Sequence, residues 1–129
     1  KRQFFDIFSD KTKQFGFKAV FPSGKVLACL GDEPFNEKCR NFVQNCDYLM
    51  CEAFCLYSQK DIFKPYEKFH STALDAGKLA ESLFAKNLIL YHTEDETLQT
   101  RKSTYTSEAR TVFNGNIFVP DDFEVIDLK

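Results

Sequence analysis

Four side chains suited to acid–base or metal chemistry lie at the ends of expected secondary-structure elements. Asp32, Glu52 and His92 each end a strand-like apolar run, and His70 stands just before an expected helix. Carboxylate and imidazole groups bind zinc, manganese and iron, and two such ions can promote phosphodiester hydrolysis. Asp32 and His92 would be metal ligands, but a catalytic zinc takes about three protein ligands. The chain alone is therefore not expected to close a metal site.

Each of these residues also has an ordinary structural interpretation. A Gly-Asp pair such as the one ending at Asp32 is common in turns, and a histidine such as His92 often serves only as a hydrogen-bonding group. His70 could simply lead into a helix cap, and Glu52 could be an exposed carboxylate. Spacing alone leaves both interpretations open.

The elements that must position these residues alternate between strands and helices, which predicts an α/β fold with the strand ends at one shared edge. Alternating and continuous apolar runs predict strands at 4–8, 15–21, 25–30, 47–51, 87–91, 116–120 and 123–128. Helical spacing predicts helices at 36–44, 72–86 and 98–113, and a polar turn at 9–13 follows the first strand. The connection 55–70 is long enough to predict a binding loop or lid.

The helix expected at 72–86 carries the clearest local signals. Thr72 and Asp75 have capping-box spacing, and an apolar face is formed by Ala73, Ala76, Leu79, Ala80, Leu83 and Phe84. The later helix should bury Leu98, Tyr105, Ala109, Val112 and Phe113. The acidic stretch 94–96 before it is expected to be a solvated turn that favours the helix dipole.

The composition indicates one ordinary globular domain or half-domain spanning residues 1–129. A net charge of −2 gives no overall attraction to nucleic acid or membranes, although Lys60, Lys64 and Lys68 could share one face. The five cysteines are expected to be reduced core residues, and a cytoplasmic location is the default. Fifteen phenylalanines suggest that some aromatic groups are meant for a surface that this chain does not cover by itself.

An ordered set of motifs resembles the second half of the metallo-β-lactamase fold, in its ribonuclease Z-like branch. The set runs through Gly31-Asp32, then 47–54, then His70-Ser71-Thr72-Ala73, then 88–92, and ends near Val119-Pro120-Asp121-Asp122. The resemblance implies an αββα sandwich whose mixed sheet carries helices packed on one face. It also implies metal-dependent hydrolysis, with phosphodiesters or nucleic acid as the substrate class.

The resemblance assigns a role to each of the four residues. Asp32 would bridge two metal ions, expected to be zinc, with manganese or iron as alternatives, and His92 would bind the second ion. His70, assisted by Glu52, would support the scissile phosphate or protonate the leaving oxygen. Cys51 and Phe54 replace a His and a Thr of the family motif, and Thr93-Glu94-Asp95 replaces a Phe-Ser, so transfer-RNA end processing itself is not implied.

The His-x-His-x-Asp-His signature of that family, which supplies most metal ligands, does not occur in this sequence. We therefore expect a partner in the form of the amino-terminal half of the fold, either upstream in a longer polypeptide or separate, and a homodimer is a further possibility. The alternative is a non-catalytic half-fold that acts as a binding module through its Phe-rich first strands.

Overall fold

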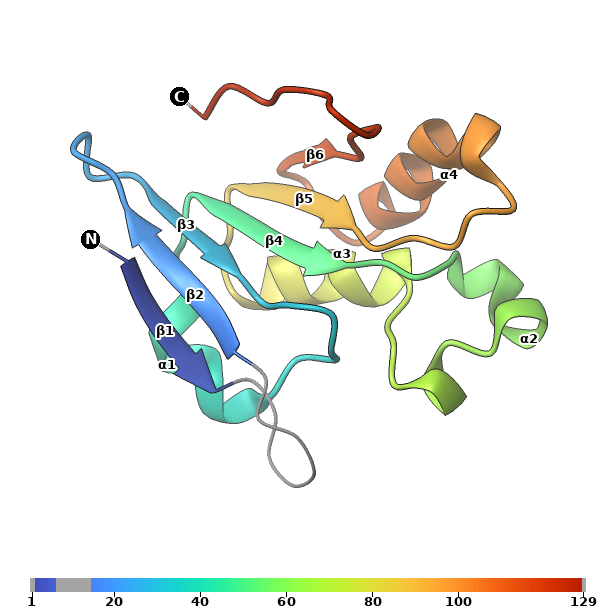
Figure 1. Ribbon diagram of the computed structural model, residues 1–129, viewed down its shortest axis with the longest axis horizontal. Helices are drawn as coiled ribbons and strands as arrows, with labels where there is room; N and C mark the ends of the chain where they lie inside the picture. The colour runs from blue at the N-terminus through green and yellow to red at the C-terminus, as the bar shows by residue number, and fades with distance from the viewer. Residues whose placement is uncertain (1, 7–14, 129) are drawn as a thin grey trace.

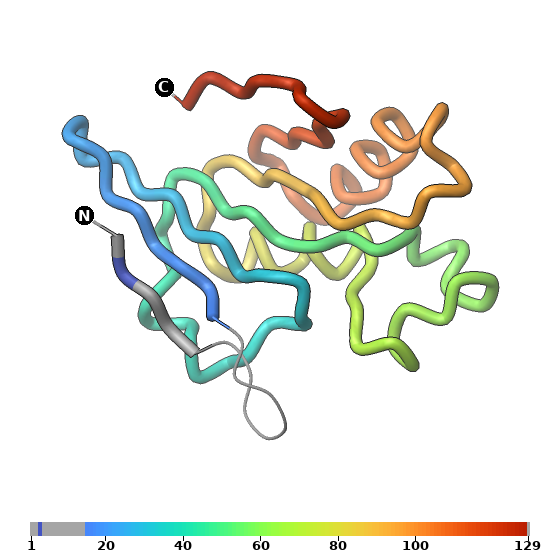
Figure 2. Tube along the Cα trace, viewed as in Figure 1, coloured from blue at the N-terminus to red at the C-terminus, as the bar shows by residue number. Residues whose placement is uncertain are grey.

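The computed structural model describes residues 2–6 and 15–128, which form a six-stranded mixed sheet flanked by helices (Figures 1 and 2). The strands lie side by side in chain order from β1 to β6. The first three pair antiparallel, and β3 to β6 pair parallel. The strands are β1 (Arg2–Asp6), β2 (Phe15–Val20), β3 (Val26–Cys29), β4 (Tyr48–Glu52), β5 (Asn87–Tyr91) and β6 (Asn116–Phe118).

Helical segments connect the parallel strands, and the longer ones cover one face of the sheet (Figure 1). They are η1 (Glu37–Cys39), α1 (Arg40–Val43), η2 (Tyr57–Gln59), α2 (Lys60–Phe63), η3 (Tyr66–Lys68), α3 (Ala73–Ser82) and α4 (Leu98–Arg110). The main core lies between this layer and the sheet, where Ala28, Leu49, Leu88 and Leu90 are fully buried. The α/β prediction, with helices packed on one face of a mixed sheet, is confirmed.

The capping box predicted for α3 is present. The Thr72 hydroxyl accepts a hydrogen bond from the backbone N–H of Asp75, and the Asp75 carboxylate accepts one from the N–H of Thr72. The helix ends at Ser82 rather than at residue 86, because Phe84 turns into the left-handed region with φ 55°. Phe84 is 70% exposed, so its predicted place on the buried face was wrong.

The acidic stretch before α4 is a turn in which Asp95 and Glu96 are exposed, as predicted, whereas Glu94 is buried and caps the helix. Glu94 is only 6% exposed, and its carboxylate accepts hydrogen bonds from the backbone N–H groups of Glu96 and Thr97 and from the hydroxyls of Thr97 and Tyr105. These bonds satisfy donors at the start of the helix that would otherwise be unpaired. Leu98 is half exposed, in contrast to the prediction for the buried face of this helix.

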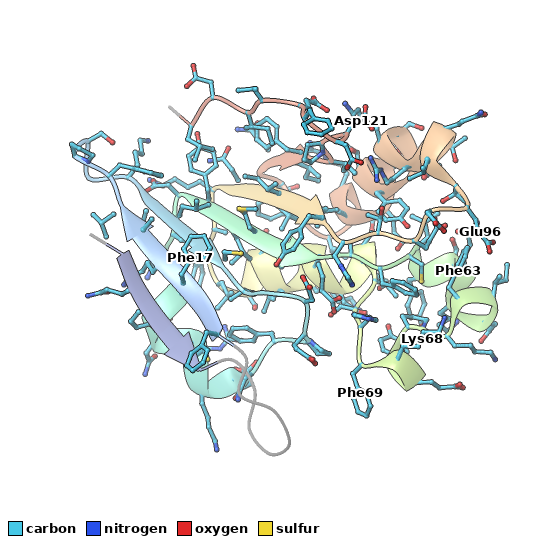
Figure 3. The ribbon with its side chains drawn as sticks, viewed as in Figure 1. Phe17, Phe63, Lys68, Phe69, Glu96 and Asp121 are labelled. Atoms are coloured by element: carbon cyan, nitrogen blue, oxygen red, sulfur yellow. The ribbon has the colours of Figure 1, made fainter. Side chains whose placement is uncertain are left out.

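The connection 55–70, predicted to be a binding loop or lid, holds η2, α2 and η3, and Figure 3 shows its side chains Phe63, Lys68 and Phe69. One further expectation needs correction. No strand forms at 123–128 in the described part of the chain, where Phe123 and Val125 are almost fully exposed. The predicted strand at 4–8 is described only as far as Asp6, and the predicted turn at 9–13 lies outside the described residues.

Asp47 joins three strands at the end of the sheet opposite the expected site. Its carboxylate accepts hydrogen bonds from the backbone N–H of Val26 at 2.8 Å and from the Lys86 ammonium at 3.0 Å. Its carbonyl accepts one from the Asn87 side chain at 2.7 Å. Burial acts to raise the pKa of this carboxyl, but the N–H of Val26 and the Lys86 ammonium outweigh it and the pKa is lowered.

The cysteines are unpaired, and all but Cys29 are buried, as predicted for reduced core residues. Burial raises the pKa of the Cys46 thiol to about 11 and that of the Cys55 thiol to about 12, so both stay protonated at neutral pH. None of the helices in the described residues has the length and apolar character required to span a bilayer.

Candidate active site

Three of the four predicted site residues lie at one edge of the sheet, because the strands that carry them run parallel. Glu52 is the last residue of β4, His92 follows β5 directly, and Asp32 lies three residues beyond β3. The arrowheads of these strands point the same way in Figure 1. His70 reaches the same edge from the segment before α3, and its ring centroid lies 5.0 Å from that of His92.

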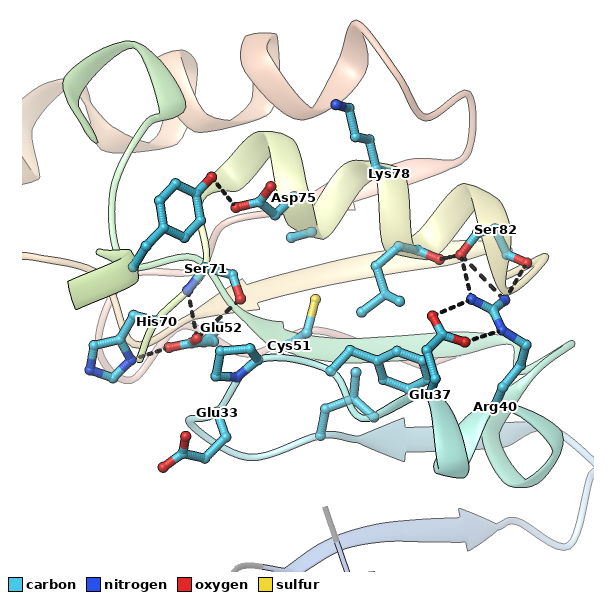
Figure 4. Close-up of a pocket in the computed structure, with 16 residues that line it drawn as sticks. Glu33, Glu37, Arg40, Cys51, Glu52, His70, Ser71, Asp75, Lys78 and Ser82 are labelled. Carbon is cyan, nitrogen blue, oxygen red and sulfur yellow. Dashed lines mark hydrogen bonds and ion pairs between the residues drawn. The ribbon is translucent and has the colours of Figure 1, made fainter. Parts of the chain in front are cut away.

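Glu52 and His70 form a close acid–base pair. The Oε2 atom of Glu52 lies 2.5 Å from Nδ1 of His70, and Oε1 accepts hydrogen bonds from the backbone N–H of Ser71 at 2.7 Å and from its hydroxyl at 3.2 Å (Figure 4). The Glu52 side chain is 1% exposed, whereas that of His70 is 20% exposed. The carboxylate therefore fixes the ring through Nδ1 and leaves Nε2 for a substrate.

The surroundings of Glu52 shift its proton affinity upward. Burial raises the pKa of Glu52 to about 8, and the hydrogen bonds from Ser71 and the charge of His92 only partly oppose this effect. A carboxyl group with a raised pKa beside an imidazole is typical of groups that transfer protons in a reaction. The pair thus has the chemical character of a proton donor and its supporting group.

Asp32 and His92 form a second, more open pair. The Oδ2 atom of Asp32 lies 3.8 Å from Nδ1 of His92, and the two side chains are 53% and 41% exposed. The backbone turns sharply next to Asp32 and at His92, with φ 79° at Gly31 and φ 56° at His92. A non-glycine residue in the left-handed region stores strain of about 1 kcal/mol or more, which is often found at functional sites.

The spacing of this open pair fits a shared metal ion. Two ligands at about 2.1 Å from one tetrahedral ion lie about 3.4 Å apart, which is close to the observed 3.8 Å. Glu52, His70 and His92 also bring ligand atoms within 4.8 Å of one another. Both oxygens of Glu52 are already engaged by His70 and Ser71, so Asp32 and His92 are the more open candidates for holding a metal.

Comparison with known proteins places this geometry in context. No protein-family model matches the chain. It is 32% identical over 98 residues to the ribonuclease Z proteins of Bacillus cereus strain AH187 and Bacillus thuringiensis strain Al Hakam, an alignment that covers 76% of this chain and 31% of each relative. The chain is ribonuclease Z-like and has part of the metallo-β-lactamase fold. The resemblance in the sequence motifs is thereby confirmed.

Solved structures support the fold assignment of this ribonuclease Z-like chain. The metallo-β-lactamase-fold protein YhfI from Bacillus subtilis superposes with a TM-score of 0.74 at 19% identity, covering 92% of this chain and 46% of YhfI. The short form of human tRNase Z gives 0.73 at 24% identity, covering 99% of this chain and 43% of the human protein. The chain thus corresponds to less than half of each structural relative and about a third of the sequence relatives.

Two residues that support this group of side chains carried no clear signal in the sequence. Phe54, noted only as a departure from the family motif, stacks on His70 with ring centroids 4.9 Å apart and planes inclined by 22°. The Tyr91 hydroxyl donates a hydrogen bond of 2.6 Å to the carbonyl of Gly31. Burial raises the pKa of Tyr91 well above its ordinary value, so the hydroxyl stays a donor. Tyr91 thus connects the segments that carry Asp32 and His92.

Proposed function

We propose that this chain contributes one part of the active site of a metal-dependent phosphodiesterase that acts on RNA. The observation that carries the proposal is the convergence of two distinct pairs at one sheet edge, the buried Glu52–His70 pair and the open Asp32–His92 pair. Relatives named ribonuclease Z support RNA as the substrate. A cytoplasmic location and a homodimer stay predictions of the sequence.

Asp32 and His92 would hold the metal, together with ligands from another part of the fold. A divalent metal, when bound, supplies positive charge that stabilises phosphate oxygens and makes water a stronger nucleophile. Zinc is the proposed ion, with two ions in the complete site and manganese or iron as alternatives. A site with two ligands from this chain needs further ligands from elsewhere.

His70 would act on the leaving group. With Nδ1 held by Glu52, a protonated ring would present an N–H at Nε2 that can donate to the departing oxygen. Phe54 restricts the ring from one side by stacking. Because the ring is held before substrate arrives, little orientational freedom has to be lost in the transition state.

The sheet face opposite the helices supports a complementary half as the partner. Phe17, Cys29 and Met50 are register partners on neighbouring strands, so their side chains share one face. All three are only partly buried, and none belongs to the core cluster beneath the helices. A second layer packed on this face would bury them, as expected of an αββα sandwich.

The test uses the protein in its full encoded length, stripped of metal and then supplied with zinc or manganese. Hydrolysis of bis(p-nitrophenyl) phosphate and bound metal by elemental analysis are measured for native protein, Asp32→Ala and His92→Ala. Removing a group that only hydrogen-bonds to a metal ligand lowers metal affinity by about 10- to 100-fold. Removing a ligand itself, as in Asp32→Ala or His92→Ala, should lower metal affinity at least that much and should abolish the metal-stimulated rate.

Asp61→Ala serves as the matched control, because Asp61 is an exposed carboxylate on α2 that is not among the proposed ligands. It should keep native metal content and rate. Full metal-stimulated hydrolysis in Asp32→Ala and His92→Ala would refute the assignment. A stable, metal-free and inactive native protein would instead favour the non-catalytic binding module.

A further inference from the structure

A cavity of about 420 Å³ opens directly beside the Glu52–His70 pair. It lies between the η1–α1 segment, the end of β4 and the exposed side of α3 (Figure 4). Glu52 and His70 lie at one end and Arg40 and Ser82 at the other, with Cys51 between them. A substrate group next to the bond that His70 serves would therefore enter this cavity.

Apolar side chains line part of the cavity, and the aromatic ring of Phe35 is among them. Leu30, Phe35 and Leu79 contribute to the lining, and all three also pack with the hydrophobic core. Such a lining favours a flat, weakly hydrated group over a charged one. Stacking on an aromatic side chain is a common way in which proteins hold a base of single-stranded nucleic acid.

The far end of the cavity is polar but electrically balanced. The Arg40 guanidinium donates two hydrogen bonds to the Glu37 carboxylate, at 2.8 and 2.9 Å, and one to the carbonyl of Ser82 at 3.1 Å. Because the positive charge is matched by Glu37, this end offers little attraction to a second phosphate. Oxygens of Glu37 and Ser82 can instead accept hydrogen bonds from a neutral ligand.

We propose that this cavity binds the nucleobase of the nucleotide next to the scissile phosphate. The proposal rests on the phosphodiesterase function proposed above and deepens it, because it says where one base of the RNA substrate would bind. The volume suits this ligand, since small-molecule sites start at about 300 Å³. The base occupies the apolar centre, and its polar edge faces the Glu37–Arg40 end.

The test is isothermal titration calorimetry on the full encoded length of the protein with the four ribonucleoside 5′-monophosphates and with ribose 5-phosphate, which lacks a base. Stacking of one base corresponds to about 5- to 150-fold in affinity. The native protein should therefore bind at least one nucleotide at least about fivefold more tightly than ribose 5-phosphate.

Two variants narrow the cavity in different ways. Leu79→Phe fills the centre from α3, and Ser82→Phe closes the far end at an exposed position. Both should lose the preference for nucleotides and keep the affinity for ribose 5-phosphate, which also shows that the protein is folded. Leu98→Phe is the control for Leu79→Phe, because it makes the same Leu-to-Phe change at a half-exposed position on α4 outside the cavity. It should behave as the native protein.

Hydrolysis measured in the same samples separates this proposal from the one on which it rests. Equal binding of nucleotides and ribose 5-phosphate overturns the base site, even if metal-dependent hydrolysis is present. Retention of the nucleotide preference in both narrowing variants also overturns it. A preference that both narrowing variants abolish, in a protein that shows no hydrolysis with any metal, supports the base site and refutes the phosphodiesterase.

Discussion

Replacing Glu52 by Gln probes the proton-handling pair with little change in side-chain volume. Above its raised pKa of about 8, Glu52 is ionised and can accept hydrogen bonds from the N–H and O–H of Ser71 and from an Nδ1–H of His70. A glutamine has only one acceptor oxygen, so in either orientation its amide N–H₂ faces at least one of these donors. At 1% exposure no water can relieve this conflict, and an unsatisfied buried donor costs about 1–3 kcal/mol.

We expect Glu52→Gln to lower kcat for phosphodiester hydrolysis by about 10²- to 10⁴-fold, the usual contribution of general acid catalysis. This range corresponds to about 3–5 kcal/mol of transition-state stabilisation. The loss should appear in kcat rather than in KM, because His70 acts on the leaving oxygen only as the bond breaks.

The matched control for this substitution is Glu108→Gln. The Glu108 carboxylate also accepts three hydrogen bonds, from the backbone N–H groups of Tyr57, Ser58 and Leu74, at 2.6, 3.4 and 3.1 Å. Glu108→Gln should therefore lower thermal stability without changing kcat. If Glu52→Gln retains kcat within about threefold while its melting temperature falls as in the control, the pair is structural and the reasoning fails.

Three further substitutions test how the site and its scaffold are held. Tyr91→Phe leaves the carbonyl of Gly31 without its hydrogen bond, so zinc affinity measured by calorimetry should fall. An unchanged affinity would show that the segment carrying Asp32 is held by other contacts. Because the pKa of Asp47 is lowered in the folded state, its charge stabilises the fold above the unfolded pKa of about 3.9 and this stabilisation is lost as the pH falls through the folded value. Urea unfolding should therefore show a deficit for Asp47→Asn that is constant from pH 5 to 7 and shrinks below pH 4, and a deficit that does not depend on pH would contradict this. Gly77→Ala should lower the free energy of unfolding by about 1–3 kcal/mol, because the new Cβ would lie 2.8 Å from the side chain of Val112 and 2.9 Å from the backbone oxygen of Ala109. A more stable variant would mean that the gain of about 1 kcal/mol in helix propensity outweighs the clash.

The site could be predicted from the sequence to the extent that it follows from strand direction. Asp32, Glu52 and His92 come together because β3, β4 and β5 are parallel and in register, which places their carboxyl ends at one edge. The continuous apolar runs of these strands indicated that arrangement. The contact between Glu52 and His70 is different, since it depends on how the segment 53–69 folds back, and only the family resemblance suggested it.

The failed predictions share a physical cause, which is that pattern rules do not show where a neighbour will be. Glu94 was assigned to solvent because it lies in an acidic run, yet the donors at the start of α4 and the Tyr105 hydroxyl surround it. Phe84 follows the helical period of α3, but the helix ends before it. The strand predicted at 123–128 is rich in apolar residues, although β6 pairs only with β5 in the described sheet and gains no further strand.

The contrast in burial between the two pairs bears on how the complete site would form. Glu52 is almost fully enclosed and its bonding partners all come from this chain, so the orientation of His70 is set before any metal or second half arrives. Asp32 and His92 are about half exposed, at a distance too long for a hydrogen bond. Carboxylate and imidazole groups left open in this way can still accept a cation and further ligands from outside. Metal binding should therefore order the open pair and leave the buried pair unchanged, so the His70 signals in an NMR titration with zinc should shift far less than those of His92.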